Sequence, residues 1–323
     1  MYYVSEQMAR DLVDQDAVTD AVSASFVALA SESATCFPVV RETLGHADAT
    51  FGLKSGFDRA APVLGVKAGG LWPGNAEKGV PNHQSTVVLF DEGSGVPSAV
   101  VRATYLTALR TAAASALSIR HLARREATTL GLVGAGGQAI FQLNAALKER
   151  PFDRVLIVDP DEDNAARLAE AARDRGLAAE ITGPQSLAAR ADVIITITPS
   201  RRAILEDRWV KGGTHLACMG ADTVGKQEVE PALVGRARVF GDVAGQAVTL
   251  GECQHAFAAG MIGEDDITPL GLVIAGRRPG RVSQDDITVF DSTGIALQDL
   301  ASARLAVKAA TDAGRIVVLD ELG

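Results

Sequence analysis

The sequence predicts an α/β protein whose central part is a doubly wound parallel sheet. Short apolar runs alternate with amphipathic helical stretches through the middle of the chain, and a glycine-rich turn joins the first such run to the first such helix. In the N-terminal part, strand-like runs lie between Gly-, Pro- and Asn-rich turns, which is more typical of a mixed or antiparallel sheet. A length of 323 residues also suits two domains.

The elements of the N-terminal part are expected first. Strands should cover residues 63–67 and 85–90, and a helix should run from 105 to about 124. The central part then alternates: strands are expected at 127–133, 154–158, 192–198 and 214–219, and helices at 138–147 and 162–175.

A strand at 288–290 and an amphipathic helix at 299–313 come last. Because chain termini often lie close together, we expect this helix to fold back on the first domain. The predicted division is therefore one domain of residues 1–115 plus 299–323, with a domain of residues 116–298 inserted in it.

The composition is that of a folded, acidic protein. Hydrophobic residues make up 47%, and 31 Lys and Arg face 40 Asp and Glu, a formal net charge of −9. This excess argues against nucleic-acid and anionic-membrane partners, which carry charge of the same sign. No run approaches about 18 apolar residues and no secretory signal is visible, so we expect no membrane span. Cys36, Cys218 and Cys253 are widely spaced, which indicates reduced thiols of a cytoplasmic protein and no metal site.

A phosphate-binding turn is predicted at Gly134-x-Gly136-x-x-Ala139, directly after a strand and at the start of a helix. The first glycine permits the tight turn, the second lets the backbone approach a pyrophosphate, and the third small residue allows helix–strand contact. Asp159 follows the next strand, where it can accept hydrogen bonds from ribose hydroxyls and repel a 2′-phosphate. The pattern therefore predicts a Rossmann-type domain that prefers NAD(H). A 2′-phosphate has three alternative partners, Arg167, Arg201 and Arg202.

Four cations before this turn are candidates for holding a substrate. Lys67 ends an apolar run, from which it can point into a cleft. Arg110 lies in a helix of small and mostly apolar residues, where it needs a partner because an unpaired buried charge is costly. A substrate carboxylate is one such partner for Arg110, and an internal salt bridge is an equal alternative. Lys67 has the alternative of a strand end in solvent. For Arg41 and Lys54, spacing alone favours an ordinary solvated face.

Asp222 follows a strand end among small residues and is a candidate proton donor or acceptor. Its alternative is a helix N-cap or an Asx-turn. The five histidines lack metal-ligand spacing and no Gly-x-Ser-x-Gly motif occurs, so hydrolase and metalloenzyme functions are disfavoured.

Six segments together resemble the ornithine cyclodeaminase/μ-crystallin family: KAGG at 67–70, STVVLF at 85–90, LRTAA at 109–113, GAGGQ at 134–138, GADTVGK at 220–226 and VFDSTGIALQD at 289–299. The resemblance implies a substrate and dimerisation domain, formed by both ends of the chain, around an NAD(P)-binding Rossmann domain. It also implies a homodimer.

The resemblance further implies roles for individual residues. Arg41, Lys67 and Arg110 would hold the substrate carboxylate, and Thr293 would lie beside the substrate. Asp222 would carry out proton chemistry at the substrate nitrogen, and we also count Lys67 as catalytic. The expected cofactor contacts are Thr86, Arg110, Gly134, Gly136, Gly137, Gln138, Asp159, Thr198, Met219, Gly220, Lys226 and Ser292.

One departure bears on the substrate. Ornithine-cyclising members carry a carboxylate shortly after the Arg41 region, whereas here the only acid between Glu42 and Asp58 is Asp48, and Lys54 is added. A cation suits a second substrate carboxylate, and the runs 37–48 and 51–54 most resemble members that reduce iminosuccinate to L-aspartate with NADH. The alternatives are an alanine dehydrogenase or another imino-acid reductase, an ornithine cyclodeaminase, and a crystallin-like protein that binds cofactor without turnover.

Overall fold

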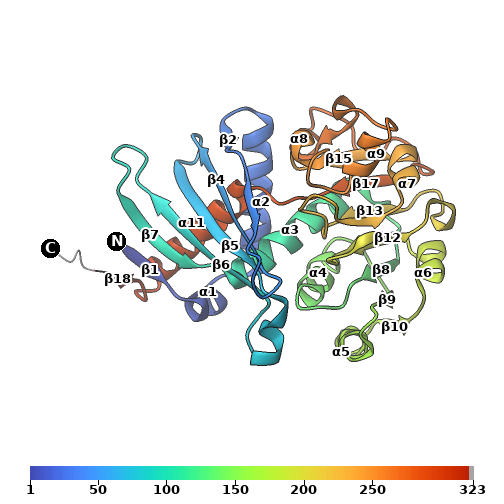
Figure 1. Cartoon of the computed structure of the whole chain (residues 1–323), viewed down its shortest axis with the longest axis horizontal. Helices are drawn as coiled ribbons and strands as arrows, with labels where there is room; N and C mark the ends of the chain where they lie inside the picture. The colour runs from blue at the N-terminus through green and yellow to red at the C-terminus, as the bar shows by residue number, and fades with distance from the viewer. Residues whose placement is uncertain (320–323) are drawn as a thin grey trace. The chain divides into compact units, whose positions relative to one another are not determined.

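The computed structural model describes residues 1–319 (Figure 1). Its contacts divide the chain into two compact units: unit 1 is Met1–Arg110 with Ile295–Gly323, and unit 2 is Thr111–Gly294. Helix α3 (Thr104–Leu122) begins in unit 1 and continues in unit 2. The functions assigned to the two domains from the sequence remain predictions.

Unit 1 is built on an eight-stranded sheet in the order β18-β1-β7-β6-β5-β4-β2, with β3 also paired to β4. All pairs are antiparallel except β1 with β7. The strands are β1 (Tyr2–Val4), β2 (Ala34–Cys36), β3 (Val40–Thr43), β4 (Thr50–Asp58), β5 (Val63–Leu71), β6 (His83–Phe90), β7 (Pro97–Arg102) and β18 (Val317–Val318). Both expected strands are present, and each is longer than the apolar run that predicted it.

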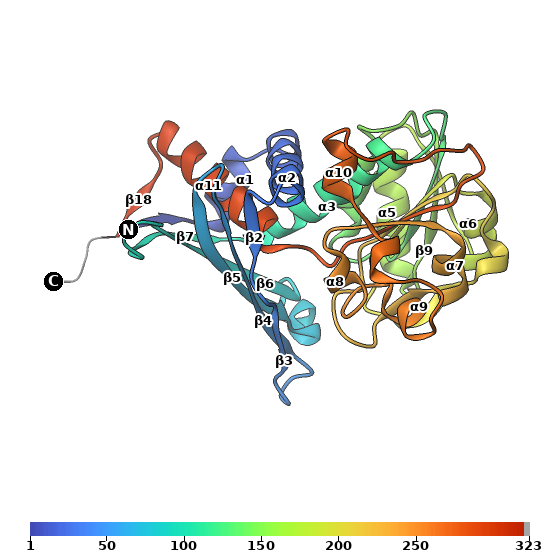
Figure 2. The ribbon, with the colours of Figure 1, turned by 90° about the horizontal axis from the view of Figure 1, so that it is seen from above.

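Helices cover one face of this sheet. They are α1 (Glu6–Leu12), α2 (Gln15–Ala30) and α11 (Ala296–Asp312), which lie on the same side in Figure 2. The side chains of Ser5 and Asp14 cap the first two by accepting backbone N–H groups. At Gly65 a Cβ would lie 2.7 Å from the Leu300 side chain, so α11 approaches the sheet closely. The chain therefore brings its C-terminal helix onto strands that are formed by its N-terminal part.

Unit 2 contains an eight-stranded parallel sheet in the order β10-β9-β8-β11-β13-β17-β15-β16. The strands are β8 (Thr129–Val133), β9 (Arg154–Val158), β10 (Ala178–Ile181), β11 (Val193–Thr196), β13 (His215–Cys218), β15 (Arg238–Gly241), β16 (Thr268–Pro269) and β17 (Thr288–Asp291). Two further strands, β12 (Arg201–Leu205) and β14 (Gln227–Val229), pair with each other. The helices are α4 (Ala139–Ala146), α5 (Glu162–Arg173), α6 (Pro184–Arg190), α7 (Pro231–Arg236), α8 (Ala244–Ala247), α9 (Gln254–Ala258) and α10 (Leu270–Ile274).

The central strands of unit 2 are buried on both faces, as expected where helices pack on both sides. The predicted doubly wound Rossmann-type sheet is confirmed. Its strand order reverses between β8 and β11, and ligands of such sheets bind outside the carboxyl ends of the strands at this switch point. Residues that bind a ligand are therefore expected at the carboxyl edge of this sheet.

No helix within residues 1–319 is long and apolar enough to cross a membrane. The three cysteines are free thiols: Cys218 and Cys253 are buried in unit 2, and Cys36 is half-buried in unit 1.

Candidate active site

The glycine-rich turn lies between β8 and α4. Gly134 has a φ of +101°, and a Cβ there would lie 2.7 Å from the carbonyl oxygen of Ile197, so only glycine fits. At Gly136 and Gly137 a Cβ would meet nothing within 4 Å, so the backbone before α4 is open to a ligand. Ala139 is buried at the start of the helix. These are the properties that a pyrophosphate-binding turn requires.

Asp159 lies beside this turn. Its Oδ2 accepts the N–H of Ala135 at 2.5 Å, and its Oδ1 accepts the N–H of Asp161 at 2.8 Å. The carboxylate is thereby fixed where an acid meets ribose hydroxyls in this fold. Gln138 directly follows Gly137 of the glycine-rich turn, and its buried side-chain oxygen Oε1 finds no hydrogen-bond partner within residues 1–319. The turn, the carboxylate and the unused acceptor fit an adenine dinucleotide.

The other expected cofactor residues of unit 2 lie at the carboxyl ends of strands. Thr198 and Met219 follow β11 and β13, and Ser292 follows β17. Gly220 comes directly after Met219, and the ammonium group of Lys226 donates to the Gly220 carbonyl at 3.1 Å. The fold thus brings residues from distant parts of the sequence to one edge of the sheet.

Asp222 forms an ion pair with Lys226, with 2.7 Å between Oδ1 and Nζ, and accepts a hydrogen bond from the hydroxyl of Thr223. No helix begins at Asp222, so the alternative of a helix N-cap is wrong. The carboxyl group is half-buried in a loop at the carboxyl edge of the sheet. The ion pair with Lys226 holds the carboxylate in place at this edge.

Arg41, Lys54 and Lys67 project from the same face of the sheet of unit 1. Arg41 pairs with Gly52 on β4, two residues before Lys54, and Lys54 lies directly opposite Lys67 on β5. Since alternate residues of a strand share a face, all three side chains lie on one side. Lys54 and Lys67 are only 8% and 6% exposed, so the solvated alternatives for both are wrong.

Asp299 of α11 joins two of the predicted substrate residues. Its carboxylate lies 2.7 Å from Nζ of Lys67 and 2.9 Å from Nε of Arg110, whose Nη1 donates to Gln298. The internal salt bridge proposed as an alternative for Arg110 is therefore present. It does not use the whole guanidinium group, because among residues 1–319 nothing accepts a hydrogen bond from Nη2. The ion pair with Asp299 holds the guanidinium group of Arg110 in place and leaves its Nη2 as a donor for a further carboxylate.

The electrostatics of this cluster depend on burial. Burial lowers the pKa of Lys67 to about 7; Asp299 opposes this change, and Arg110 and Lys54 add to it. Burial would raise the pKa of Asp299, but Arg110, Lys67 and Lys54 outweigh it and hold that pKa below its usual value. Asp299 is therefore ionised, and three cations act on it.

Thr86 and Thr293 have other surroundings within their own units. Thr86 of β6 is adjacent to Val87, which pairs with Lys67, so Thr86 lies on the opposite face of the sheet from Lys67. Thr293 is buried in unit 2 and donates to the side chain of Gln246 at 2.9 Å. The roles predicted for both from the resemblance stay predictions.

Comparisons with known proteins agree with this geometry. The ornithine cyclodeaminase/mu-crystallin family matches residues 3–314. The chain belongs to this family. It is 49% identical over 314 residues to the iminosuccinate reductase of Paracoccus denitrificans, which covers 97% of this chain and 98% of that one.

Two solved members of the family are closely similar. The iminosuccinate reductase of Paracoccus denitrificans in complex with NAD+ has a TM-score of 0.93 at 48% identity, covering 99% of both chains. An archaeal alanine dehydrogenase dimer with bound NAD has a TM-score of 0.92 at 32% identity, again covering 99% of both chains. The chain therefore shares the Rossmann-type fold of unit 2 with NAD-bound members of the family, and the similarity extends over 99% of its length.

Sequence reasoning missed Asp299 and Gln298 as site residues. Asp299 was given no role at the site and appeared as the last position of a family segment and the first of a predicted helix, yet it is buried and touches two of the predicted cations. A signal was present: Asp299 is an isolated acid in the first turn of a helix whose neighbours Leu297 and Leu300 are apolar. A buried carboxylate in that setting requires cationic partners.

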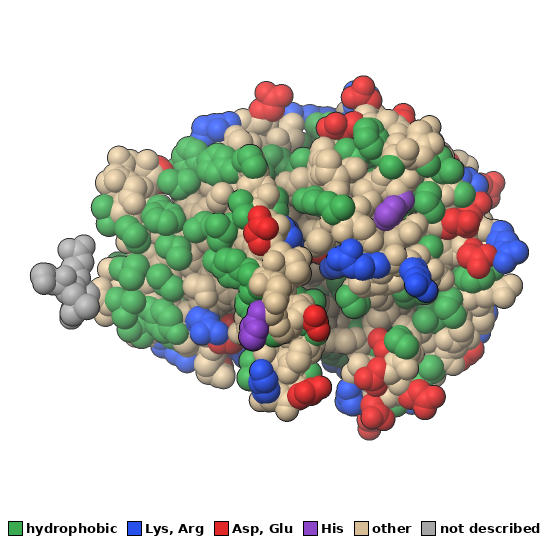
Figure 3. Space-filling model, viewed as in Figure 1, with side chains coloured by type: hydrophobic (Ala, Val, Ile, Leu, Met, Phe, Trp, Pro, Cys, Tyr) green, Lys and Arg blue, Asp and Glu red, His purple; other side chains and the backbone are tan. Residues whose placement is uncertain are grey.

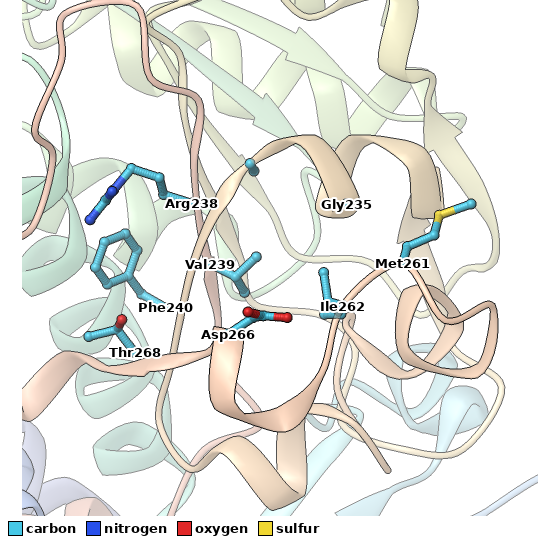
Figure 4. A pocket seen from close by; sticks show the side chains of 9 residues that line it. Gly235, Arg238, Val239, Phe240, Met261, Ile262, Asp266 and Thr268 are labelled. Atoms are coloured by element: carbon cyan, nitrogen blue, oxygen red, sulfur yellow. The ribbon is translucent and has the colours of Figure 1, made fainter.

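A separate pocket of about 370 Å³ lies in unit 2 beside β15 (Figure 4). It is lined by Arg238, Val239, Phe240, Met261, Asp266 and their neighbours, and contains none of the predicted site residues. The pocket therefore has no place in the assignment of the active site.

Proposed function

We propose that this protein reduces an imino dicarboxylate, iminosuccinate, to L-aspartate with NADH. The observation that carries the proposal is the pair of buried lysines, Lys54 and Lys67, on the sheet face that α11 covers. On this side Asp299 of α11 pairs with both Lys67 and Arg110. Burying cations is costly unless anions compensate them. A substrate with two carboxylates supplies more of that compensation than a monocarboxylate does. The similarity to iminosuccinate reductase supports the same substrate.

The residues of unit 1 would position the substrate. Lys67 and the free Nη2 of Arg110 would bind the α-carboxylate, and Lys54 or Arg41 the distal one. Asp299 would hold Lys67 and Arg110 at fixed positions. Cationic side chains that are held in place before the substrate arrives lose little conformational entropy on binding, which favours the reactive geometry.

The residues of unit 2 would hold the cofactor and move the proton. Amide groups of the turn at Gly136 and Gly137 would bind the pyrophosphate, and Asp159 the ribose hydroxyls. When bound, NADH supplies a hydride to the imine carbon. Asp222 would orient the imine nitrogen, or protonate it as the C=N bond becomes a C–N bond.

Alanine dehydrogenase is the second candidate, favoured by the similarity to the archaeal dimer. NADH oxidation with ammonia and either oxaloacetate or pyruvate decides between the two, with glyoxylate, 2-oxoglutarate and an ornithine-to-proline assay beside them. Faster turnover with oxaloacetate supports the proposal. A preference for pyruvate, or proline formation without net NADH consumption, would exclude it.

We also propose a cytoplasmic homodimer that associates through the sheet of unit 1. The sheet face opposite α11 carries Val40, Phe51 and Leu53, which are between 36% and 46% exposed, and a broad green area covers this sheet in Figure 3. An exposed apolar face of this kind is typical of an interface between subunits. The free thiols support a reducing compartment.

A further inference from the structure

Glu228, at the middle of β14, is fully buried and joins two strands of the parallel sheet. Its Oε1 accepts the backbone N–H of Thr198 at 2.7 Å. Its Oε2 accepts the hydroxyl of Thr196 at 2.6 Å and the backbone N–H of Gly220 at 2.9 Å. One carboxylate therefore ties the segment after β11 to the segment after β13.

The contact is close enough to restrict the sequence around it. At Gly220 a Cβ would lie 2.5 Å from Oε1 of Glu228 and 2.4 Å from the carbonyl oxygen of Thr198. Only glycine lets the segment after β13 approach the carboxylate this closely. Glu228 is itself held in place, because the buried carboxylate of Glu252 accepts the N–H groups of Glu228 and Val229, each at 2.8 Å.

Burial acts on the carboxyl groups of both glutamates. Burial and the neighbouring Glu228 raise the pKa of Glu252 well above its usual value. Burial also raises the pKa of Glu228, and the hydrogen bonds from Thr196, Thr198 and Gly220 make this rise smaller. An ionised carboxylate accepts hydrogen bonds only, which matches the three donors that face it.

The strand order indicates which half of the dinucleotide these segments meet. Asp159, the ribose-binding acid, follows β9 on one side of the glycine-rich turn, so the adenosine half lies toward β9 and β10. The nicotinamide half then lies on the other side of the switch point, where β11 and β13 end. Thr198 and Gly220 lie at those ends.

Building on the proposed use of NADH, we propose that Glu228 positions the nicotinamide half of the cofactor by tying the ends of β11 and β13 together through Thr198 and Gly220. Glu228 is a positioning residue, because both oxygens of its carboxylate already accept hydrogen bonds from protein groups. The adenosine half does not depend on it, because Asp159 and the glycine-rich turn lie on the β8 and β9 side of the sheet.

The test uses Glu228→Gln in the full chain. The glutamine amide group offers one acceptor oxygen and one NH2 group, so one of the two backbone N–H groups loses its acceptor. Glu230→Gln is the matched control: Glu230 is two residues further on and accepts the N–H of Asp207 at 2.8 Å, away from the ends of β11 and β13. Equilibrium affinities for NADH and for ADP-ribose, which lacks nicotinamide, are measured by fluorescence or calorimetric titration.

We expect Glu228→Gln to weaken NADH binding by about tenfold and ADP-ribose binding by less than about twofold. Amide exchange at Thr198 and Gly220 should become faster, and Glu230→Gln should change neither affinity. Equal losses of affinity for both ligands, or no loss of affinity for NADH, overturn the proposal.

If Glu228→Gln does not fold, Thr196→Val, which removes one donor only, must show the same selective loss at smaller size. A wild-type protein that does not bind NADH overturns the proposed function and this inference together, whereas one that binds and uses NADH while the variants bind it normally overturns the inference alone.

Discussion

Lys54 and Lys67 lie directly opposite each other across the β4–β5 ladder, both buried on the face that α11 covers. Like charges in this arrangement destabilise a sheet. Asp299 compensates part of the repulsion through its 2.7 Å contact with Lys67. Under the proposed function, an anionic substrate would compensate more of it.

The first prediction concerns the distal carboxylate. Lys54→Met should reduce the specificity for oxaloacetate plus ammonia by roughly 30-fold and spare pyruvate plus ammonia, because only the dicarboxylate loses a buried partner. Steady-state kcat/KM values for the two reactions provide the comparison. Arg110→Lys, at the α-carboxylate, should damage both reactions alike. If Lys54→Met lowers kcat/KM equally for both reactions, or for neither, Lys54 does not bind the distal carboxylate and Arg41 becomes the candidate.

The second prediction concerns the cofactor. Asp159→Ser should narrow the preference for NADH over NADPH, because the carboxylate that repels a 2′-phosphate is gone. NADH affinity itself should also fall, since Asp159 accepts the N–H of Ala135 in the phosphate-binding turn. Kd values for both cofactors measure the change. Wild-type protein that binds NADPH as well as NADH contradicts the assignment of Asp159.

The third prediction concerns pH. Since the pKa of Lys67 is lowered to about 7, its ammonium group binds a carboxylate below that pH and loses its charge above it. The inhibition constant of succinate, which stays doubly ionised from about pH 6.5 to 9, should therefore rise through this range. Lys67→Arg keeps its charge and should abolish this dependence. An unchanged pH profile in that variant would show that another group titrates.

The lowered pKa of Lys67 also affects the free energy of unfolding. The unfolded chain keeps Lys67 protonated up to its ordinary pKa of 10.5, whereas the folded protein releases that proton near 7. The unfolded state therefore binds more protons between these values, so this residue's contribution to stability increases as the pH rises through them. Denaturant titrations of the wild type and Lys67→Met should differ in this slope, and parallel profiles would argue against the shifted pKa.

The fourth prediction concerns Asp299. Asp299→Asn leaves Lys67 and Arg110 buried without their carboxylate and should cost about 3–5 kcal/mol of unfolding free energy. Asp312→Asn on the same helix removes an exposed ion pair with Lys308 and should cost less than about 1 kcal/mol. Urea unfolding of both variants checks the difference. Similar small costs would mean that the buried cations find other partners.

The fifth prediction concerns the subunit interface. Val66→Lys places a charge on the uncovered face of the sheet of unit 1 and should convert the proposed dimer to monomers in sedimentation experiments. Val282→Lys, at an exposed position of unit 2, should leave the association unchanged. A wild-type monomer would exclude the interface.

The sequence by itself determined the features that depend on neighbours along the chain. Apolar runs predicted β8, β9, β11, β13 and β17 but missed the other strands of unit 2. The strand β9 matches its predicted run of 154–158 because a strand buried on both faces is apolar throughout. The glycine-rich turn and Asp159 were recognisable because their roles follow from backbone geometry and from their place after strands. Helix 299–313 was predicted three residues late, since Ala296 and Leu297 lack a distinctive helix-start signal.

Only the tertiary structure decided which charged side chains meet. Asp299 and Arg110 are 189 positions apart, and nothing local distinguishes a buried lysine on β4 or β5 from one at a solvated strand end. Glu228 gave no signal either, because its partners follow strands that are neighbours only in the folded sheet. Electrostatic pairing depends on distance and burial in three dimensions, and both are set by strand register and by the packing of α11.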